Sequence, residues 1–351
     1  MTSPPVRPIA RYRDAASGRP AEDVLRDVAN ALKGAQRILV ATHLNPDGDA
    51  LGSQVGLGLG LRALQKEVRI VASEVLPEKF EPLFLPGIIE LVRDAGDLRG
   101  ASPADFAVLL DTAERERTGV PPDAFFGAAP RSICLDHHIW RGEEAFDLQL
   151  VVTEAPSTGN LVLALLDLLE VPLTRDIAQA LWIAVASDTG WFSFENTTPW
   201  ALHDALRLAE TGLELHPIHQ RLHQDCPIAR AHVLGAVLQG LESSFDGAFV
   251  WSFLDGSLLE REGLALSDLD GMIDHVKAIR GARIAALVVE VEPGSFKVSL
   301  RAPGRADVET IARRFGGGGH AKAAGCRYRG TREGLFRDLS AAVEEALRGA
   351  Q

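Results

Sequence analysis

Aspartate and histidine side chains recur at four points along the chain, and each point follows a largely apolar stretch. These residues are His43, Asp47 and Asp49, then Asp111, then Asp136, His137 and His138, and finally Asp188. No compensating Lys or Arg stands beside these carboxylates, so at neutral pH they would repel one another unless they held protons or cations. Cations are the simpler explanation. Carboxylate and imidazole ligands without cysteine suit Mn²⁺ or Mg²⁺ better than structural zinc.

The ligands are numerous enough for two metal ions. Two divalent cations that share a carboxylate lower the pKa of a bound water and supply hydroxide at neutral pH. Such a centre also neutralises charge on a phosphoryl group during an in-line displacement. The predicted reaction is therefore hydrolysis of a phosphoester.

The elements that would position these residues alternate between helix and strand. Short apolar runs predict buried strands at 37–43, 68–72, 106–111 and 132–136. Helical spacing of apolar residues indicates helices at 24–32, at 50–65 and twice within 158–188. This alternation favours an α/β fold, with a parallel sheet and crossover helices. Because ligands of such sheets bind outside the carboxyl ends of the strands, we expect the four sets to converge.

Each set also has an ordinary structural explanation. Residues 45–49 read Asn-Pro-Asp-Gly-Asp, which is common turn and N-cap chemistry. A strand that ends in Asp111 is commonplace, and Asp188 could cap a loop. Adjacent histidines after Asp136 are less common. One polar strand end has a local explanation, but four together favour a functional site.

The chain of 351 residues has room for two domains. The proline-rich residues 1–20 lack the apolar segment of a signal peptide and predict a flexible arm. We expect a catalytic domain at 21–212, a helical linker at 213–243 and a smaller α/β substrate-binding domain at 244–351. The linker is rich in histidine, and we favour solvated side chains over a metal cluster for His216, His219, His223 and His232.

The formal net charge of −12 argues against a protein that coats long nucleic acid. The charge is uneven, however, because residues 271–351 hold 14 Lys and Arg against 9 Asp and Glu, a balance of +5. The three cysteines are too few for a disulfide framework, which fits a reducing cytoplasm. No apolar stretch approaches the length of a membrane span, so we expect a cytoplasmic protein without a membrane partner.

Four consecutive glycines precede His320 in the predicted second domain. Ordering such a run costs conformational entropy, so it suggests backbone that approaches a ligand too closely for a Cβ atom. Backbone N–H groups in such a loop can bind phosphate, and Arg313 and Arg314 lie nearby in sequence. The alternative is an ordinary flexible loop.

The four sets, in their order, resemble the four motifs of the DHH phosphoesterase superfamily. The segments concerned are THLNPDGDALGS, LLDTAERERTG, the triplet Asp136-His137-His138, and SDTGWFSFENTTP. The later segment GGGGHAKAAG resembles the glycine-rich signature of the DHH-associated substrate domain. The resemblance extends from residue 35 to residue 328.

This resemblance implies a role for each matched residue. His43 and Asp47 would bind one Mn²⁺, and Asp49 and His137 the other, with Mg²⁺ as the alternative metal. Asp111 and Asp188 would be shared between the two ions. His138 would face the scissile phosphate, and Asp136 would orient its neighbours. In the second domain, Gly317, Gly318, Gly319 and His320 would hold the far end of the substrate, and Arg301 would pair with its terminal phosphate.

Within the superfamily, the chain is most similar to the short two-domain nanoRNases and pAp phosphatases of the NrnA type. The implied activity is degradation of RNA of roughly two to five nucleotides to mononucleotides, together with hydrolysis of 3′-phosphoadenosine 5′-phosphate (pAp). Enzymes that cleave cyclic di-AMP or its linear product pApA are close alternatives, because their motifs are the same. From another class, a retired nucleotide-binding protein would predict a lost ligand, and all six are present. The oligomeric state stays open, with a homodimer as one option.

Overall fold

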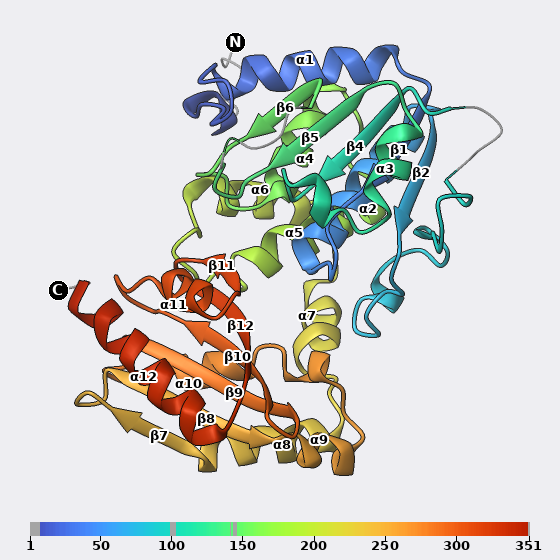
Figure 1. The fold of residues 1–351 in the computed structure, drawn as a ribbon. Helices are drawn as coiled ribbons and strands as arrows, with labels where there is room; N and C mark the ends of the chain where they lie inside the picture. Colours follow the sequence, from blue (N-terminus) through green and yellow to red (C-terminus); the bar gives the residue numbers. More distant parts are fainter. Residues whose placement is uncertain (1–7, 99–102, 141, 143–145, 350–351) are drawn as a thin grey trace. The chain divides into compact units, whose positions relative to one another are not determined.

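The computed structural model describes residues 8–98, 103–140, 142 and 146–349. The chain divides into two compact units, Met1–Asp225 and Cys226–Gln351, and each contains one six-stranded sheet (Figure 1). No helix in the described ranges is long and apolar enough to cross a membrane.

The sheet of unit 1 is parallel throughout, as its alternating pattern predicts. Its strands are β1 (Arg37–Ala41), β2 (Glu67–Ala72), β3 (Glu90–Leu91), β4 (Phe106–Leu110), β5 (Ser132–Asp136) and β6 (Leu148–Val151). Their order is β3-β2-β1-β4-β5-β6, so the chain runs outward from β1 in one direction and from β4 in the other. A ligand crevice is expected where the two directions diverge, at the carboxyl ends of β1 and β4.

Helices cover both faces of this sheet. The larger core holds α1 (Ala21–Gly34), α2 (Gly48–Ala63), α4 (Thr158–Leu168), α5 (Arg175–Asp188) and α6 (Pro199–Ala209), and α3 (Pro122–Gly127) packs on the other face. α2 lies very close to α5: a Cβ atom at Gly52 would lie 2.3 Å from the carbonyl oxygen of Ala180. This contact fixes the spacing of the two helices that carry Asp49 and Asp188.

The prediction of a flexible arm is wrong for residues 8–20, whereas residues 1–7 lie outside the described residues. Ile9 is fully buried, and Tyr12 stacks on Trp200 with ring centroids 5.2 Å apart. The carboxylate of Asp14 accepts a hydrogen bond of 2.8 Å from the backbone N–H of Val151. The prolines and arginines of this segment suggested disorder, but these few anchoring residues bind it to β6 and α6.

The segment predicted as a helical linker contains two helices that belong to different units. α7 (Leu215–His223) packs on unit 1 through the buried Ile218, and α8 (Ile228–Gln239) packs on unit 2 through Val233 and Val237. The domain boundary therefore lies at residues 225 and 226, not at the two ends of the linker.

The sheet of unit 2 mixes parallel and antiparallel strands. They are β7 (Leu241–Ser244), β8 (Phe249–Asp255), β9 (Ile284–Glu292), β10 (Ser295–Arg301), β11 (Gly318–His320) and β12 (Ala323–Arg329), in the order β11-β12-β10-β9-β8-β7. α11 (Val308–Arg314) and α12 (Arg332–Gly349) pack on one face. α8, α9 (Gly256–Glu262) and α10 (Met272–Lys277) pack on β8 and β9 from the other.

Candidate metal centre

The carboxyl ends of the central strands of unit 1 bring the predicted acids and histidines together. His43 follows β1, Asp111 follows β4, and Asp136 ends β5 directly before His137 and His138. Asp47 caps the N-terminus of α2 by accepting the N–H groups of Asp49 and Ala50, and Asp188 is the last residue of α5. All eight residues therefore lie at one end of the parallel sheet, as the sequence predicts.

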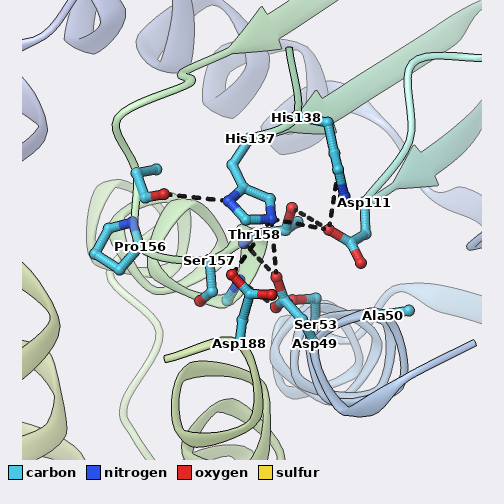
Figure 2. Close-up of polar contacts among 12 residues, drawn as sticks. Asp49, Ala50, Ser53, Asp111, His137, His138, Pro156, Ser157, Thr158 and Asp188 are labelled. Carbon is cyan, nitrogen blue, oxygen red and sulfur yellow. Dashed lines mark hydrogen bonds and ion pairs between the residues drawn. The ribbon is translucent and has the colours of Figure 1, made fainter. Parts of the chain in front are cut away.

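The ligand atoms form compact groups. One group is His43, Asp47 and Asp111, and a second is Asp49, His137 and Asp188; in each, the ligand atoms lie within 4.8 Å of one another. His137 Nε2 lies 3.7 Å from both Asp49 Oδ2 and Asp188 Oδ2, and 3.6 Å from Asp111 Oδ1 (Figure 2). Asp111 thus lies between the groups and suits a shared ligand. Asp188 belongs to the second group only, so the geometry gives less support to its predicted sharing.

Backbone carbonyls hold two of the imidazoles in the form that binds metal. His43 Nδ1 lies 2.8 Å from the carbonyl of Leu44, and His137 Nδ1 lies 3.1 Å from the carbonyl of Ala155. A carbonyl oxygen only accepts hydrogen bonds, so each Nδ1 carries a proton and Nε2 is the nitrogen left to bind a metal. His43 Nε2 lies 3.3 Å from Asp111 Oδ2. Both Nε2 atoms therefore lie among the carboxylates.

His138 is held differently. Its Nδ1 lies 2.7 Å from Asp136 Oδ1, and the same oxygen accepts the backbone N–H groups of His137 and His138. Burial alone would lower the pKa of His138, but the hydrogen bond and charge of Asp136 raise it to about 9. Burial would raise the pKa of Asp136, but His138 lowers it. This pairing favours a charged imidazole beside the metal groups over a further metal ligand.

The N-terminus of α4 supplies contacts to the carboxylates that the sequence analysis did not single out. Thr158 donates its backbone N–H to Asp49 Oδ2 at 2.7 Å and its hydroxyl to Asp111 Oδ1 at 2.9 Å (Figure 2). Gly159 N–H and Ser53 Oγ each donate to Asp49 Oδ1 at 2.9 Å. The sequence does contain a signal for the start of this helix, because Ser157 is a typical N-cap residue. Only the fold, however, brings the N-terminus of the helix close to Asp49 and Asp111.

The electrostatics of the centre fit cations. Burial, followed by the charges of Asp49 and Asp47, raises the pKa of Asp111 well above its usual value. Burial likewise raises the pKa of Asp49 to about 7, with Asp188 and Asp47 adding to the effect and His137 opposing it. Among the described residues, no Lys or Arg forms an ion pair with Asp49, Asp111 or Asp188. Four carboxylates and two oriented imidazoles therefore suit a pair of divalent cations.

Asp111 has an unusual backbone conformation. Its φ of 63° lies in the left-handed region, which costs an aspartate about 1 kcal/mol. Its N–H still donates to the carbonyl of Leu135 at 3.0 Å, so the ladder between β4 and β5 continues to this residue before the chain turns. Strain of this kind at a buried acid of the cluster is typical of a functional site.

The residues predicted to hold the substrate lie in unit 2. Strand pairing places His320 opposite Ala323, and Ala323 opposite Arg301, so all three occupy one row of the sheet. The room beside Gly317 and Gly319 is already filled: a Cβ atom would lie 2.2 Å from the carbonyl oxygen of Gly325 and 2.5 Å from that of Ala323, respectively. Only Gly318 of these three faces open space. Close strand packing thus explains two of the glycines without a ligand.

Arg115 and the histidines of the predicted linker lie outside the ligand groups. The guanidinium of Arg115 lies over the rings of Phe126 and Phe146, 4.3 and 5.0 Å from their centroids. His219 and His223 pack edge-on against Trp191. Neither histidine is in a group of three or more potential metal ligands among the described residues.

Comparison with family models identifies both parts of the chain. The model of the DHH family N-terminal domain matches residues 37–185, and the model of the DHHA1 domain matches residues 248–349. The chain therefore belongs to the DHH family, and it is a hydrolase that acts on phosphodiester or phosphate bonds.

Curated relatives extend over nearly the whole chain. A protein of Thermus thermophilus described as "Bifunctional oligoribonuclease and PAP phosphatase NrnA" is 33% identical over 325 residues, which are 92% of this chain and 92% of the relative. A protein of Bacillus subtilis with the same description is 28% identical and covers 82% of this chain and 88% of its own length.

Solved structures share the fold. An exopolyphosphatase-related protein from Bacteroides fragilis matches 92% of this chain and 96% of its own with a TM-score of 0.85, at 22% sequence identity. RecJ from Thermus thermophilus, solved with Mn²⁺, has a TM-score of 0.52 at 17% identity and covers 93% of this chain and 55% of its own.

Proposed function

We propose that this protein is an Mn²⁺-dependent phosphohydrolase that degrades RNA of roughly two to five nucleotides to mononucleotides and also removes a phosphate from pAp. The observation that carries this proposal is the pair of imidazoles, His43 and His137, whose Nδ1 atoms are held by carbonyls while their Nε2 atoms lie among buried carboxylates. The names of the two curated relatives described above agree with these substrates.

Each metal would have its own ligands and share Asp111. His43 and Asp47 would hold one ion, and Asp49, His137 and Asp188 the other. Two divalent cations, when bound, would activate water near neutral pH and neutralise charge on the phosphoryl group. Thr158 and Ser53 orient the carboxylates through their hydrogen bonds, so that these side chains need little rearrangement to act as ligands.

His138 would contact the reacting phosphate. Asp136 holds its Nδ1 proton, and the pairing keeps the ring positively charged beside the metal groups. A fixed cation at this position would stabilise negative charge on the phosphoryl oxygens as the transition state forms. Asp136 acts through His138 and is a positioning residue.

The substrate end away from the metals would be held by unit 2. Arg301 and His320 share a row of the sheet, and a Cβ atom at Gly318 would meet open space. A guanidinium is suited to bind a terminal phosphate, and a glycine without side chain lets that phosphate approach the backbone. We further propose a cytoplasmic location, where short RNA would be met in a reducing environment.

Hydrolysis of cyclic di-AMP or of pApA is the competing activity within the same chemistry. The direct test is a product-resolved assay with Mn²⁺ on pAp, pApA, cyclic di-AMP, pyrophosphate and labelled RNAs of graded length. Release of one mononucleotide at a time from only the shortest RNAs supports the proposal. Preferred cleavage of cyclic di-AMP or pApA would replace it.

Asp111→Ala removes the shared ligand and should abolish activity on every substrate. The control, Asp23→Ala, removes an exposed aspartate of α1 and should leave activity intact. If Asp111→Ala retains activity, the metal mechanism is wrong. Binding of Mn²⁺ and nucleotides by the wild-type protein without turnover of any of these substrates would overturn the proposed substrates.

A further inference from the structure

A buried polar pair joins α4 to α6. Asn160 is fully buried on the first turn of α4, and Asp204, on α6, is 2% exposed. Asn160 Nδ2 donates to Asp204 Oδ2 at 2.7 Å. The surrounding core is apolar, with buried residues such as Leu161 and Ala205 on the same helices. Burying an amide and a carboxylate costs free energy that two apolar side chains would avoid, so stability alone does not account for the pair.

Both carboxylate oxygens of Asp204 have partners. Oδ2 accepts from Asn160, and Oδ1 lies 3.0 Å from His203 Nδ1 and 3.8 Å from Arg207 Nη1. Burial raises the pKa of Asp204, but the hydrogen bonds from Asn160 and His203 oppose this effect. The carboxylate is therefore held in place, and Asn160 cannot turn away from it without leaving a buried acceptor unpaired.

Asn160 also fixes the N-terminus of α4. Its Oδ1 accepts the hydroxyl of Ser157 at 3.0 Å, and its backbone N–H donates to Ser157 Oγ at 3.3 Å. Ser157 is the N-cap, so these two hydrogen bonds close the first turn of the helix. The side chain of Asn160 thus links Asp204 on α6 to the residue directly before Thr158.

The same turn carries the donors that orient the carboxylates of the metal centre. The N–H of Thr158 donates to Asp49, and its hydroxyl donates to Asp111 (Figure 2). The N–H of Gly159 donates to Asp49 as well. Two of these three donors are backbone groups, so their direction is set by the position of the turn. A shift of the turn would disturb all three contacts together.

We propose that Asp204 is a positioning residue for the metal centre, and that it acts through Asn160 and the first turn of α4. The donors of this turn then orient Asp49 and Asp111 before a metal binds. The inference rests on the function proposed above, because it takes these two acids as metal ligands. Carboxylates that are already oriented lose less freedom when the ions bind, so the pair should strengthen metal binding.

A second link between the same two helices offers a matched control. Arg207 of α6 donates two hydrogen bonds to Asp167 of α4, at 2.7 and 2.9 Å. Asp167 follows Asn160 by seven residues, which places it about 10 Å further along the helix. Removing Asp167 therefore weakens the contact between α4 and α6 without acting on the first turn of α4.

The test compares Asp204→Ala with Asp167→Ala by calorimetric titration with Mn²⁺ alone. Both variants should unfold at a lower temperature than the wild type. Asp204→Ala should lower the affinity for Mn²⁺ about fivefold, and Asp167→Ala should leave it unchanged. Equal affinities of the two variants overturn the inference and leave the proposed function standing. If the wild type binds no Mn²⁺, the proposed function is overturned and the inference with it.

Asp204→Asn tests whether the hydrogen bond to Asn160 carries the effect. The amide oxygen can accept from Asn160, while its NH₂ group faces His203, whose exposed ring can adopt the other tautomer. This variant should therefore recover most of the Mn²⁺ affinity that Asp204→Ala loses. An asparagine variant as weak as the alanine variant overturns the inference.

Asn160→Ala tests the pair from its other side. If the two residues act through one hydrogen bond, Asn160→Ala/Asp204→Ala should lose no more Mn²⁺ affinity than Asn160→Ala alone. Losses that add would show that the residues act independently, and overturn the inference. If Asp204→Ala does not fold, Asn160→Ala takes its place in the comparison with Asp167→Ala, and equal affinities again overturn the inference.

Discussion

His138 Nδ1 and Asp136 Oδ1 lie 2.7 Å apart, and the same oxygen also accepts the N–H groups of His137 and His138. This one carboxylate thus fixes both the backbone and the ring of the histidine that follows the proposed metal ligand His137. The charge of His138 therefore depends on a residue that needs no contact with metal or substrate.

Asp136→Asn should lower kcat about 10- to 100-fold while leaving metal affinity less affected. The amide keeps the shape of the side chain but loses its charge, so the pKa of His138 falls from about 9. Bound cations would lower the pKa of His138 in both proteins. Activity should therefore decline as the pH rises, at a pH below about 9 in the wild type and at a lower pH in the variant. The pH profile of kcat measures this. Profiles that coincide would contradict the role of Asp136.

Metal binding should release protons and weaken as the pH falls below about 7. Burial, with Asp188 and Asp47, raises the pKa of Asp49 to about 7, so below that pH a proton occupies the oxygen that a metal needs. Calorimetry in buffers of different ionisation enthalpy counts these protons. Proton uptake on Mn²⁺ binding at pH 6.5 would contradict the assignment.

The stability of the metal-free protein should fall as the pH rises from about 4 to above 7. The folded-state pKa of Asp49 lies above its unfolded value, so the folded state binds the proton more tightly and loses that advantage as the pH rises through about 7. Thermal unfolding with and without Mn²⁺ should show greater stabilisation by metal at pH 8 than at pH 5. Equal stabilisation by Mn²⁺ at pH 5 and at pH 8 would contradict the raised pKa of Asp49.

Thr158→Val should reduce metal affinity about tenfold. Valine keeps the shape of threonine but loses the hydroxyl that donates to Asp111 Oδ1 at 2.9 Å, while the backbone N–H to Asp49 remains. Thr158→Ser restores the hydroxyl and should recover most of the affinity. Titration with Mn²⁺ of all three proteins provides the comparison, and a serine variant as weak as the valine variant would point to packing instead.

Gly318→Ala should affect substrate binding, whereas Gly319→Ala should affect stability. Gly319 has φ 140° and no room for a Cβ atom, so alanine should destabilise unit 2 by about 2 kcal/mol. Gly318 has open space around it, so alanine should leave the unfolding temperature unchanged and raise KM by obstructing the substrate. A Gly318 variant with normal KM would show that this position is not close to the bound substrate.

Much of the centre could be predicted from local patterns. Apolar runs located β1, β4 and β5 within a residue or two, and each was followed by the acid or histidine that the structure places at the sheet edge. The strands β3, β6, β7, β11 and β12 were not predicted. The first four are edge strands, and runs of two to four residues carry too little periodicity. Residues 8–20 were misjudged because composition does not reveal single anchors such as Ile9 and Asp14.

The sequence by itself determined the donor types and their order along the chain, because strand ends and residue chemistry are local properties. The tertiary structure decided what those donors touch. The order β2-β1-β4-β5 brought His43 to Asp111, and the packing of α4 directed Thr158 at Asp49 and Asp111. The packing of α6 on α4 brought Asp204 to Asn160. These relations join residues far apart in the chain, so they depend on the pairing of whole elements, which no local pattern encodes.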